Sequence, residues 1–360
     1  MVCQGWRAAL RILVHTSQNL MHLLSIESKF PPNHFTQLEC LEAMRRAPFW
    51  AQLTDRSRSL LEAVLTGESG IEKRHFALNN LEQAWQGTAQ ELNETYEKQA
   101  PLLAADAVRK AVRASGHKLD EVDAVFVSSC TGYLCPGVSS HLAEILDLRA
   151  DVFLQDMTGL GCGAAVPLMR AADGVVARNP EALVVTVAVE VCSAAFYVEN
   201  DFGVLISTCL FGDGAAAAVW SGRGGHWKVG DFASIHLPEQ REKIRFTNAG
   251  GYLRNQLDRS VPQLVGKVVG DLYQKRKNNP QAWVTHGGGR DVIAALEDVL
   301  PAGELHYARG VMRDYGNLSS PSVLVALKRC LDEQSTDPER IWMTAFGAGF
   351  SAHSCELMRH

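Results

Sequence analysis

The chain has 360 residues, of which 46% are hydrophobic and 21% are charged, a composition typical of a globular protein with a sizeable core. Its net charge of -5 gives no reason to expect a nucleic acid or an anionic membrane as partner. No apolar run is long enough to span a bilayer, so stable membrane insertion is not expected.

The cysteines point away from a disulfide framework or a zinc site. They are nine, an odd number, and no CxxC spacing occurs among them. A reducing, cytoplasmic location fits this usage best. One of them is a candidate reactive thiol, while the others are expected to pack as small apolar groups.

In chain order, residues 1–22 form an N-terminal extension, which we interpret as an extra helix or arm before the fold begins near Leu23. Residues 36–120 repeat apolar side chains at helical spacing, and Gly116 predicts the end of the last helix. Two β-branched runs follow, VDAVFVSSC (122–130) and ALVVTVAVEVCS (182–193). They predict buried strands separated by helices, and therefore a layered α/β protein.

A faint internal repeat divides the chain. LFGDGAAAAV (210–219) is similar to AFGAGFSA (345–352), and each is preceded by a glycine-rich turn that opens a helix, GCGAAVPLM (161–169) and GNLSSPSVL (316–324). We predict two related α/β halves, residues 23–225 and 226–360, although common glycine turns could coincide by chance.

Cys162 is the candidate nucleophile. It lies between two glycines just before a helical pattern, and small neighbours allow the sharp turn that holds a sulfur at a helix N-terminus. There the helix dipole favours the thiolate, the nucleophilic form of the side chain. The alternative is a buried structural cysteine in a tight turn.

His286 and Asn317 complete a candidate set. His286 ends a predicted strand and precedes three glycines, which leaves space around the imidazole. Asn317 follows a glycine in a turn, where helix capping is the alternative role. A cysteine, a histidine and an asparagine on such turns are the groups that thioester exchange with oxyanion stabilisation requires.

Five segments, in order and spacing, resemble those of chalcone-synthase-like type III polyketide synthases of the bacterial type: MTGLGCGAA, CLFGDGAAAAV, WVTHGGG, DYGNLSSPSVL and AFGAGFS. The resemblance covers about residues 22–358. It implies a thiolase fold, with duplicated βα halves in a five-layered αβαβα architecture, and a homodimer. It also implies an acyltransferase that condenses malonyl-CoA onto an acyl-CoA starter, without a resident cofactor or metal.

The resemblance also assigns residues. Cys162 resembles the acyl acceptor, and His286 and Asn317 the pair that holds the thioester carbonyl during decarboxylation, with His286 also pairing the thiolate. Phe211 resembles the aromatic gatekeeper between the CoA tunnel and the reaction cavity. Four positions are placed with the CoA-binding residues of the family: Lys73, Arg74, Gly288 and Arg309.

The cavity positions depart from the plant members of the family. Asn255 stands at the second gatekeeper phenylalanine, Ala195 at a cavity threonine, and Cys135 at a methionine that enters the partner subunit's cavity. The other candidate substrate-binding residues are Cys130, Thr131, Cys192 and Ser319. Because Ala195 and Asn255 are smaller than the residues they replace, we expect room for a fatty acyl starter and an alkylpyrone, alkylresorcinol or acylphloroglucinol product.

Two enzymatic alternatives remain open. One is a condensing enzyme like ketoacyl-acyl-carrier-protein synthase III, which shares the fold and the catalytic set. The other is a synthase that uses malonyl-CoA alone and makes a small aromatic polyketide, if the side of the cavity near Cys130 and Cys135 is filled.

Overall fold

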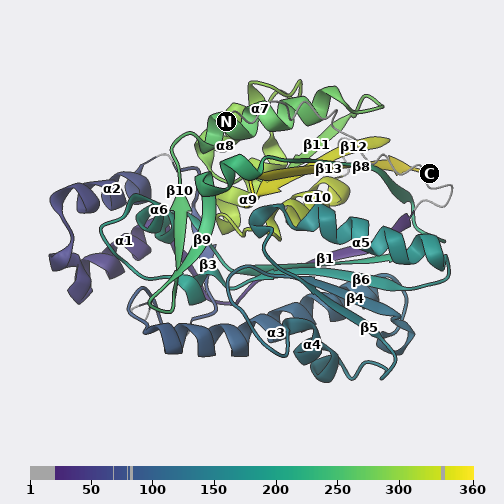
Figure 1. The fold of residues 1–360 in the computed structure, drawn as a ribbon, viewed down its shortest axis with the longest axis horizontal. Helices are drawn as coiled ribbons and strands as arrows, with labels where there is room; N and C mark the ends of the chain where they lie inside the picture. Colours follow the sequence, from purple (N-terminus) through teal and green to yellow (C-terminus); the bar gives the residue numbers. More distant parts are fainter. Residues whose placement is uncertain (1–20, 68, 79, 82–83, 334–336) are drawn as a thin grey trace, which may run out of the picture.

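The computed structural model describes residues 21–67, 69–78, 80–81, 84–333 and 337–360, and its elements form five layers (Figure 1). Residues 1–20 of the expected N-terminal arm lie outside the described residues, whereas Met21 and His22 already belong to the first strand of the fold. From one side to the other, the layers are helices, sheet, helices, sheet and helices. The αβαβα architecture predicted from the sequence is therefore confirmed.

The two halves of the chain have the same arrangement of four strands. In the first half, β4 (Ala124–Ser128) runs parallel to β6 (Val184–Glu190), followed by antiparallel β7 (Gly214–Ser221) and β1 (Met21–Lys29). The second half has β11 (Ala282–Thr285) parallel to β12 (Arg340–Gly347), followed by antiparallel β13 (Ser351–Arg359) and β8 (Trp227–His236). The same order and the same directions confirm the internal duplication.

The two halves meet along one short edge. Met21–Leu23 of β1 pairs with Trp227–Val229 of β8, which joins the strands of the two halves into one nine-stranded sheet, with β5 (Phe153–Met157) at one end. The turn between β7 and β8 spans residues 222–226, so the junction expected near residue 225 lies there.

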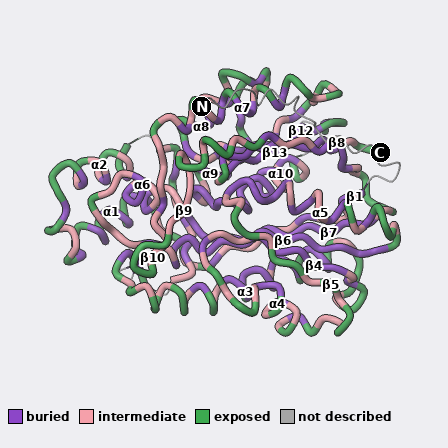
Figure 2. Tube along the Cα trace, in the orientation of Figure 1, coloured by how far each residue is buried: buried purple, intermediate pink, exposed green. Residues whose placement is uncertain are grey.

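Helices cover both faces of the sheet. Because both faces are buried, its central strands consist largely of consecutive apolar residues. The two central helices, α5 (Ala165–Arg178) and α10 (Ser322–Asp332), are packed between the halves and share one core cluster with strands of both. Outside them lie α3 (Ala89–Ala114) and α4 (Val138–Leu146) on one half, and α7 (Val261–Gln274) and α8 (Arg290–Glu297) on the other. Figure 2 shows the buried residues concentrated along these inner layers.

Helix α3 illustrates how local sequence sets an element. Thr88 and Glu91 form a capping box at its start, in which each side chain accepts a hydrogen bond from the other residue's backbone N–H. Its end lies just before Gly116, whose φ of +81° suits glycine, as the sequence predicted.

The remaining elements flank one end of the layers. They are β2 (His34–Thr36), α1 (Gln37–Arg46), α2 (Asp55–Thr66), β3 (Lys73–His75), α6 (Phe202–Leu210), β9 (Ile244–Ala249) and β10 (Tyr252–Leu257). Helix α9 (His306–Tyr315) instead packs against α10 within the layers. The span 36–120 is therefore less helical than expected, because β3 interrupts it. Within the described residues, no helix is long and apolar enough to cross a membrane.

Candidate active site

Cys162 lies in a tight turn (Gly161–Gly163) directly before α5 and is largely buried. Its sulfur lies 3.2 Å from the hydroxyl oxygen of Ser319. Burial raises the pKa of the Cys162 thiol to about 12, although the hydrogen bond from Ser319 opposes this. Desolvation therefore opposes the thiolate that the helix dipole favours.

His286 follows the last residue of β11, and its ring packs against Phe346 with the centroids 5.0 Å apart. Burial lowers its pKa to about 3, and its Nδ1 has no hydrogen-bond partner among the described residues. Burial thus favours the neutral forms of both side chains, and the thiolate–imidazolium pair stays a prediction.

Asn317 is held by its backbone and its side chain. Its N–H donates to Leu210 O (2.8 Å) and its carbonyl accepts from Gly212 N (3.0 Å). The turn that contains Asn317 therefore lies side by side with the turn at residues 210–212. Its side-chain Nδ2 donates to Gly288 O (2.9 Å), and its Oδ1 accepts from Ser319 N (2.8 Å). Helix capping is not its role, since α10 begins only at Ser322.

Cys162, His286 and Asn317 line one cavity of about 590 Å³. The candidates Phe211, Asn255 and Gly288 line the same cavity. Residues from distant segments thus converge at one end of the layers, where a nucleophile, an unpartnered imidazole and an amide face a shared space.

A second, smaller pocket lies next to this cavity and shares Phe211, Phe246 and Asn255 with it. Its other lining residues include the candidates Thr131, Cys192, Ala195 and Ser319. Only about 20 Å³ is free in this pocket.

Little space is therefore open along the wall that Ala195 and Asn255 help to form, and the neighbouring strand explains why. Phe246 on β9 is the cross-strand partner of Asn255 on β10, so an aromatic ring stands opposite the smaller residue. The amide of Asn255 is turned to Ser207, with Nδ2 2.6 Å from Oγ.

Behind the small pocket, sequence reasoning missed the buried carboxylate of Glu190. It accepts hydrogen bonds from the N–H groups of Cys130 (3.0 Å) and Thr131 (3.1 Å) and from the Ser320 hydroxyl (2.6 Å). The sulfur of Cys130 also lies 3.4 Å from Ser319 Oγ. The position of Glu190 at the end of the buried run 182–193 was the available signal.

Cys135 lies away from both pockets, exposed on the protomer. Tyr133 nearby is 75% exposed, and Phe153 on the edge strand β5 is 53% exposed. Large exposed apolar side chains of this kind favour a protein contact at this face.

One of the expected CoA contacts is contradicted by its surroundings. Arg74 is 0% exposed, and its guanidinium donates to Gln37 Oε1 (2.9 Å), Thr208 O (2.7 Å) and Phe211 O (3.0 Å). It therefore fastens the gatekeeper turn instead of meeting a ligand at the surface. Lys73 lies half-buried beside it on β3 and lines neither pocket.

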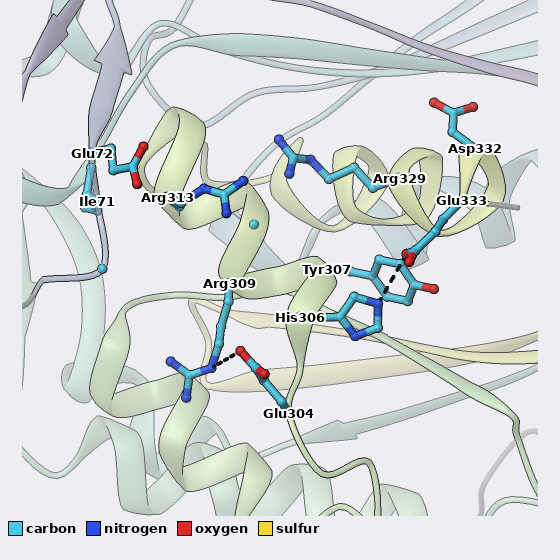
Figure 3. Close-up of a pocket in the computed structure, with 12 residues that line it drawn as sticks. Ile71, Glu72, Glu304, His306, Tyr307, Arg309, Arg313, Arg329, Asp332 and Glu333 are labelled. Carbon is cyan, nitrogen blue, oxygen red and sulfur yellow. Dashed lines mark hydrogen bonds and ion pairs between the residues drawn. The ribbon is translucent and has the colours of Figure 1, made fainter. Parts of the chain in front are cut away.

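Arg309 lies in a separate surface cavity, bounded by α9 and the end of α10 (Figure 3). There it is paired with Glu297 (Nε–Oε1 2.8 Å), and Glu304 lies close by. The charged side chains around this cavity are of both signs. Arg309 does not line the cavity that contains Cys162.

Three other arginines do line the catalytic cavity: Arg245, Arg259 and Arg290. Arg259 and Arg290 are exposed, and Arg259 lies over the Phe202 ring at 4.9 Å. They come from β9, the loop after β10 and the start of α8. Arg290 directly follows the His286 and triple-glycine segment, a signal that the sequence did contain.

Comparison with known proteins gives a consistent result. Residues 18–237 match the family described as FAE1/type III polyketide synthase-like protein, and residues 235–353 match the C-terminal domain of chalcone and stilbene synthases. A 1,3,6,8-tetrahydroxynaphthalene synthase of Streptomyces peucetius subsp. caesius is 30% identical over 91% of this chain and 90% of its own. A 3,5-dihydroxyphenylacetyl-CoA synthase of Streptomyces toyocaensis is 29% identical over 75% of each chain.

A solved structure extends the similarity to the fold. The crystal structure of 1,3,6,8-tetrahydroxynaphthalene synthase from Streptomyces coelicolor A3(2), a bacterial type III polyketide synthase, superposes with a TM-score of 0.82. It is 25% identical and covers 94% of this chain and 99% of that one.

Proposed function

The chain belongs to the type III polyketide synthases, a family of acyltransferases, and on this premise we propose that it condenses malonyl units iteratively on Cys162. The observation that carries the proposal is the meeting of Cys162, His286 and Asn317 in one cavity of about 590 Å³. The match to this family also argues against the ketoacyl-acyl-carrier-protein synthase III alternative.

In the first step, the sulfur of Cys162 attacks the carbonyl of an acyl-CoA, and coenzyme A leaves as its thiol. Because burial favours the neutral forms of Cys162 and His286, the thiol proton moves to the imidazole as the attack proceeds, and the imidazole returns it to the departing coenzyme A sulfur. The acyl group then remains on Cys162 as a thioester.

In the second step, malonyl-CoA loses CO2, and the electrons of the broken C–C bond form an enolate on the thioester oxygen. His286 and Asn317 donate hydrogen bonds to that oxygen and lower the barrier. The enolate carbon then attacks the acyl carbon on Cys162, which forms the new C–C bond and expels the cysteine sulfur.

For coenzyme A, we propose Arg245, Arg259 and Arg290 as the phosphate contacts, in place of Arg74 and Arg309. They line the cavity that contains Cys162, and guanidinium groups suit polyphosphate ligands. Gly288 lines the same cavity and stays a proposed CoA contact.

For the starter, we propose the small-substrate route that the sequence left open, malonyl-CoA alone leading to a small aromatic polyketide. The small pocket lined by Ala195 and Cys192 has only about 20 Å³ of free volume, which favours a small starter. Two relatives are named for small aromatic products, tetrahydroxynaphthalene and dihydroxyphenylacetyl-CoA. The fatty acyl starter required space on that wall, and Phe246 occupies it.

We also propose a homodimer that brings Cys135 near the partner's cavity. The exposure of Cys135, Tyr133 and Phe153 on one protomer supports it. Light scattering at micromolar concentration should give twice the chain mass, and a fully active monomer would contradict the dimer.

Incubation with malonyl-CoA alone tests the enzymatic proposal. We expect release of CO2 and of a polyketide whose number of carbon atoms is a multiple of two, which mass spectrometry can determine. Addition of long-chain acyl-CoA should leave the product profile unchanged. Absence of CO2 release would overturn the proposed function, and efficient incorporation of the long chain would overturn only the starter.

A further inference from the structure

A buried histidine outside the catalytic cavity lies directly behind the nucleophile. His353 is on β13, 2% exposed, and its ring lies beneath Gly163, the residue after Cys162. A methyl group placed on Gly163 would lie 3.5 Å from His353 Cδ2 and 3.1 Å from Gly347 N. The turn that carries Cys162 therefore rests on the His353 ring and on the turn after β12.

The two ring nitrogens of His353 have fixed roles, one as a hydrogen-bond acceptor and the other as a donor. The Ser351 hydroxyl donates to Ala348 O (3.0 Å), so its oxygen must accept from His353 Nε2 at 3.1 Å. With the proton on Nε2, Nδ1 accepts from the Ser234 hydroxyl at 2.8 Å. The chain Ser234–His353–Ser351 thus ends on the carbonyl of Ala348.

Ala348 belongs to the turn 347–349, which lines the catalytic cavity beside Cys162. The two turns are pressed together, because a Cβ on Gly347 would lie only 2.5 Å from Gly163 N and 3.0 Å from Cys162 N. Among the described residues, no backbone carbonyl accepts a hydrogen bond from the N–H of Cys162 or of Ala348. We therefore take these two N–H groups, on turns packed against each other at the cavity, as candidate donors to a carbonyl oxygen.

We infer that His353 is a positioning residue for the acyl-transfer step, which holds the 347–349 turn against the Cys162 turn through Ser351. The inference rests on the proposed function. Burial, with smaller contributions from His236 and Arg170, lowers the pKa of His353 to about 3, so the ring stays neutral and the chain keeps its direction across the working pH range.

The test compares three reactions of the full-length protein. Acylation by p-nitrophenyl acetate creates an oxyanion beside Cys162, alkylation by iodoacetamide uses the same thiol without one, and malonyl-CoA decarboxylation uses His286 and Asn317. His353→Phe keeps a ring but removes both nitrogens, and Ser351→Ala removes the next link. His353→Gln keeps an amide donor near the position of Nε2.

We expect His353→Phe and Ser351→Ala to slow acylation by at least about tenfold, while alkylation and decarboxylation change by less than about twofold. His353→Gln should recover part of the acylation rate. Ser354→Ala, a buried serine on the same strand with no side-chain hydrogen bond among the described residues, is the matched control and should behave as wild type.

Unchanged acylation in both variants would overturn the inference, as would an equal fall of all three reactions, which would indicate a purely structural role. If His353→Phe does not fold, Ser351→Ala decides alone. A wild-type protein that neither decarboxylates malonyl-CoA nor is acylated would instead refute the proposed function.

Discussion

The hydroxyl oxygen of Ser319 lies 3.2 Å from the sulfur of Cys162, although 157 positions separate them in the chain. Ser319 has a φ of +58°, unusual for a residue other than glycine, and its N–H donates to the side chain of Asn317. One residue therefore links the nucleophile to the amide of the proposed oxyanion site.

Replacement of Ser319 by alanine should raise the pKa of Cys162. Burial is the main cause of its high value, and the Ser319 hydroxyl acts in the opposite direction by stabilising the thiolate. A hydrogen bond to a charged group contributes about 1.5 kcal/mol or more, so the thiolate fraction should fall roughly tenfold. The rate of iodoacetamide inactivation against pH measures this, and Ser354→Ala is the control. A profile that stays in place, or moves to lower pH, would contradict the assignment.

Cys162→Ala should abolish polyketide formation, because no thiol remains to carry the chain. Decarboxylation of malonyl-CoA should persist, since His286 and Asn317 are untouched. Product mass spectra and CO2 release separate these outcomes. Cys40→Ala removes a buried thiol from a separate core cluster and should retain both activities. Full product formation by Cys162→Ala would show that the nucleophile is misassigned.

His286→Ala and Asn317→Ala should each slow malonyl-CoA decarboxylation by on the order of 10²- to 10³-fold, the usual cost of one oxyanion donor. Because burial keeps the pKa of His286 near 3, its neutral form should persist down to about pH 4, and decarboxylation should not fall at mildly acidic pH through its titration. Wild-type rates of CO2 release in both variants would refute the roles.

Phe246→Ala should enlarge the small pocket beside Asn255 and admit a longer starter or a longer product. Ala195→Phe should have the opposite effect and shorten the preferred acyl chain. Competition between starter CoA thioesters of increasing length, with mass spectrometry of the products, measures the shift. If neither variant changes the preferred length, this wall does not set substrate size.

Arg290→Ala and Arg259→Ala should raise the KM for malonyl-CoA with little change in kcat, because the phosphate contacts are made equally in substrate and transition state. Arg309→Ala, in the separate surface cavity, is the matched control and should leave KM unchanged. A raised KM in Arg309→Ala, with an unchanged KM in Arg290→Ala and Arg259→Ala, would instead support Arg309 as the CoA contact.

The sequence predicted a layered α/β protein and a candidate catalytic set from local features, and the resemblance to a known family supplied the thiolase fold. Glycine-flanked turns, buried apolar runs and a repeated order of motifs are local features, and they predicted the two halves, the strands 122–130 and 182–193, and the set Cys162, His286 and Asn317. Such features survive in the linear chain because backbone geometry at glycine and strand periodicity depend on near neighbours.

Other properties were decided only by tertiary structure. The burial of Arg74 depends on its carbonyl partners at Thr208 and Phe211, and the small pocket is filled because β9 places Phe246 opposite Asn255. The preference of Cys162 and His286 for their neutral forms likewise results from desolvation by residues far away in the chain. Burial, cavity volume and pKa are sums over spatial neighbours, so no local pattern of residues could supply them.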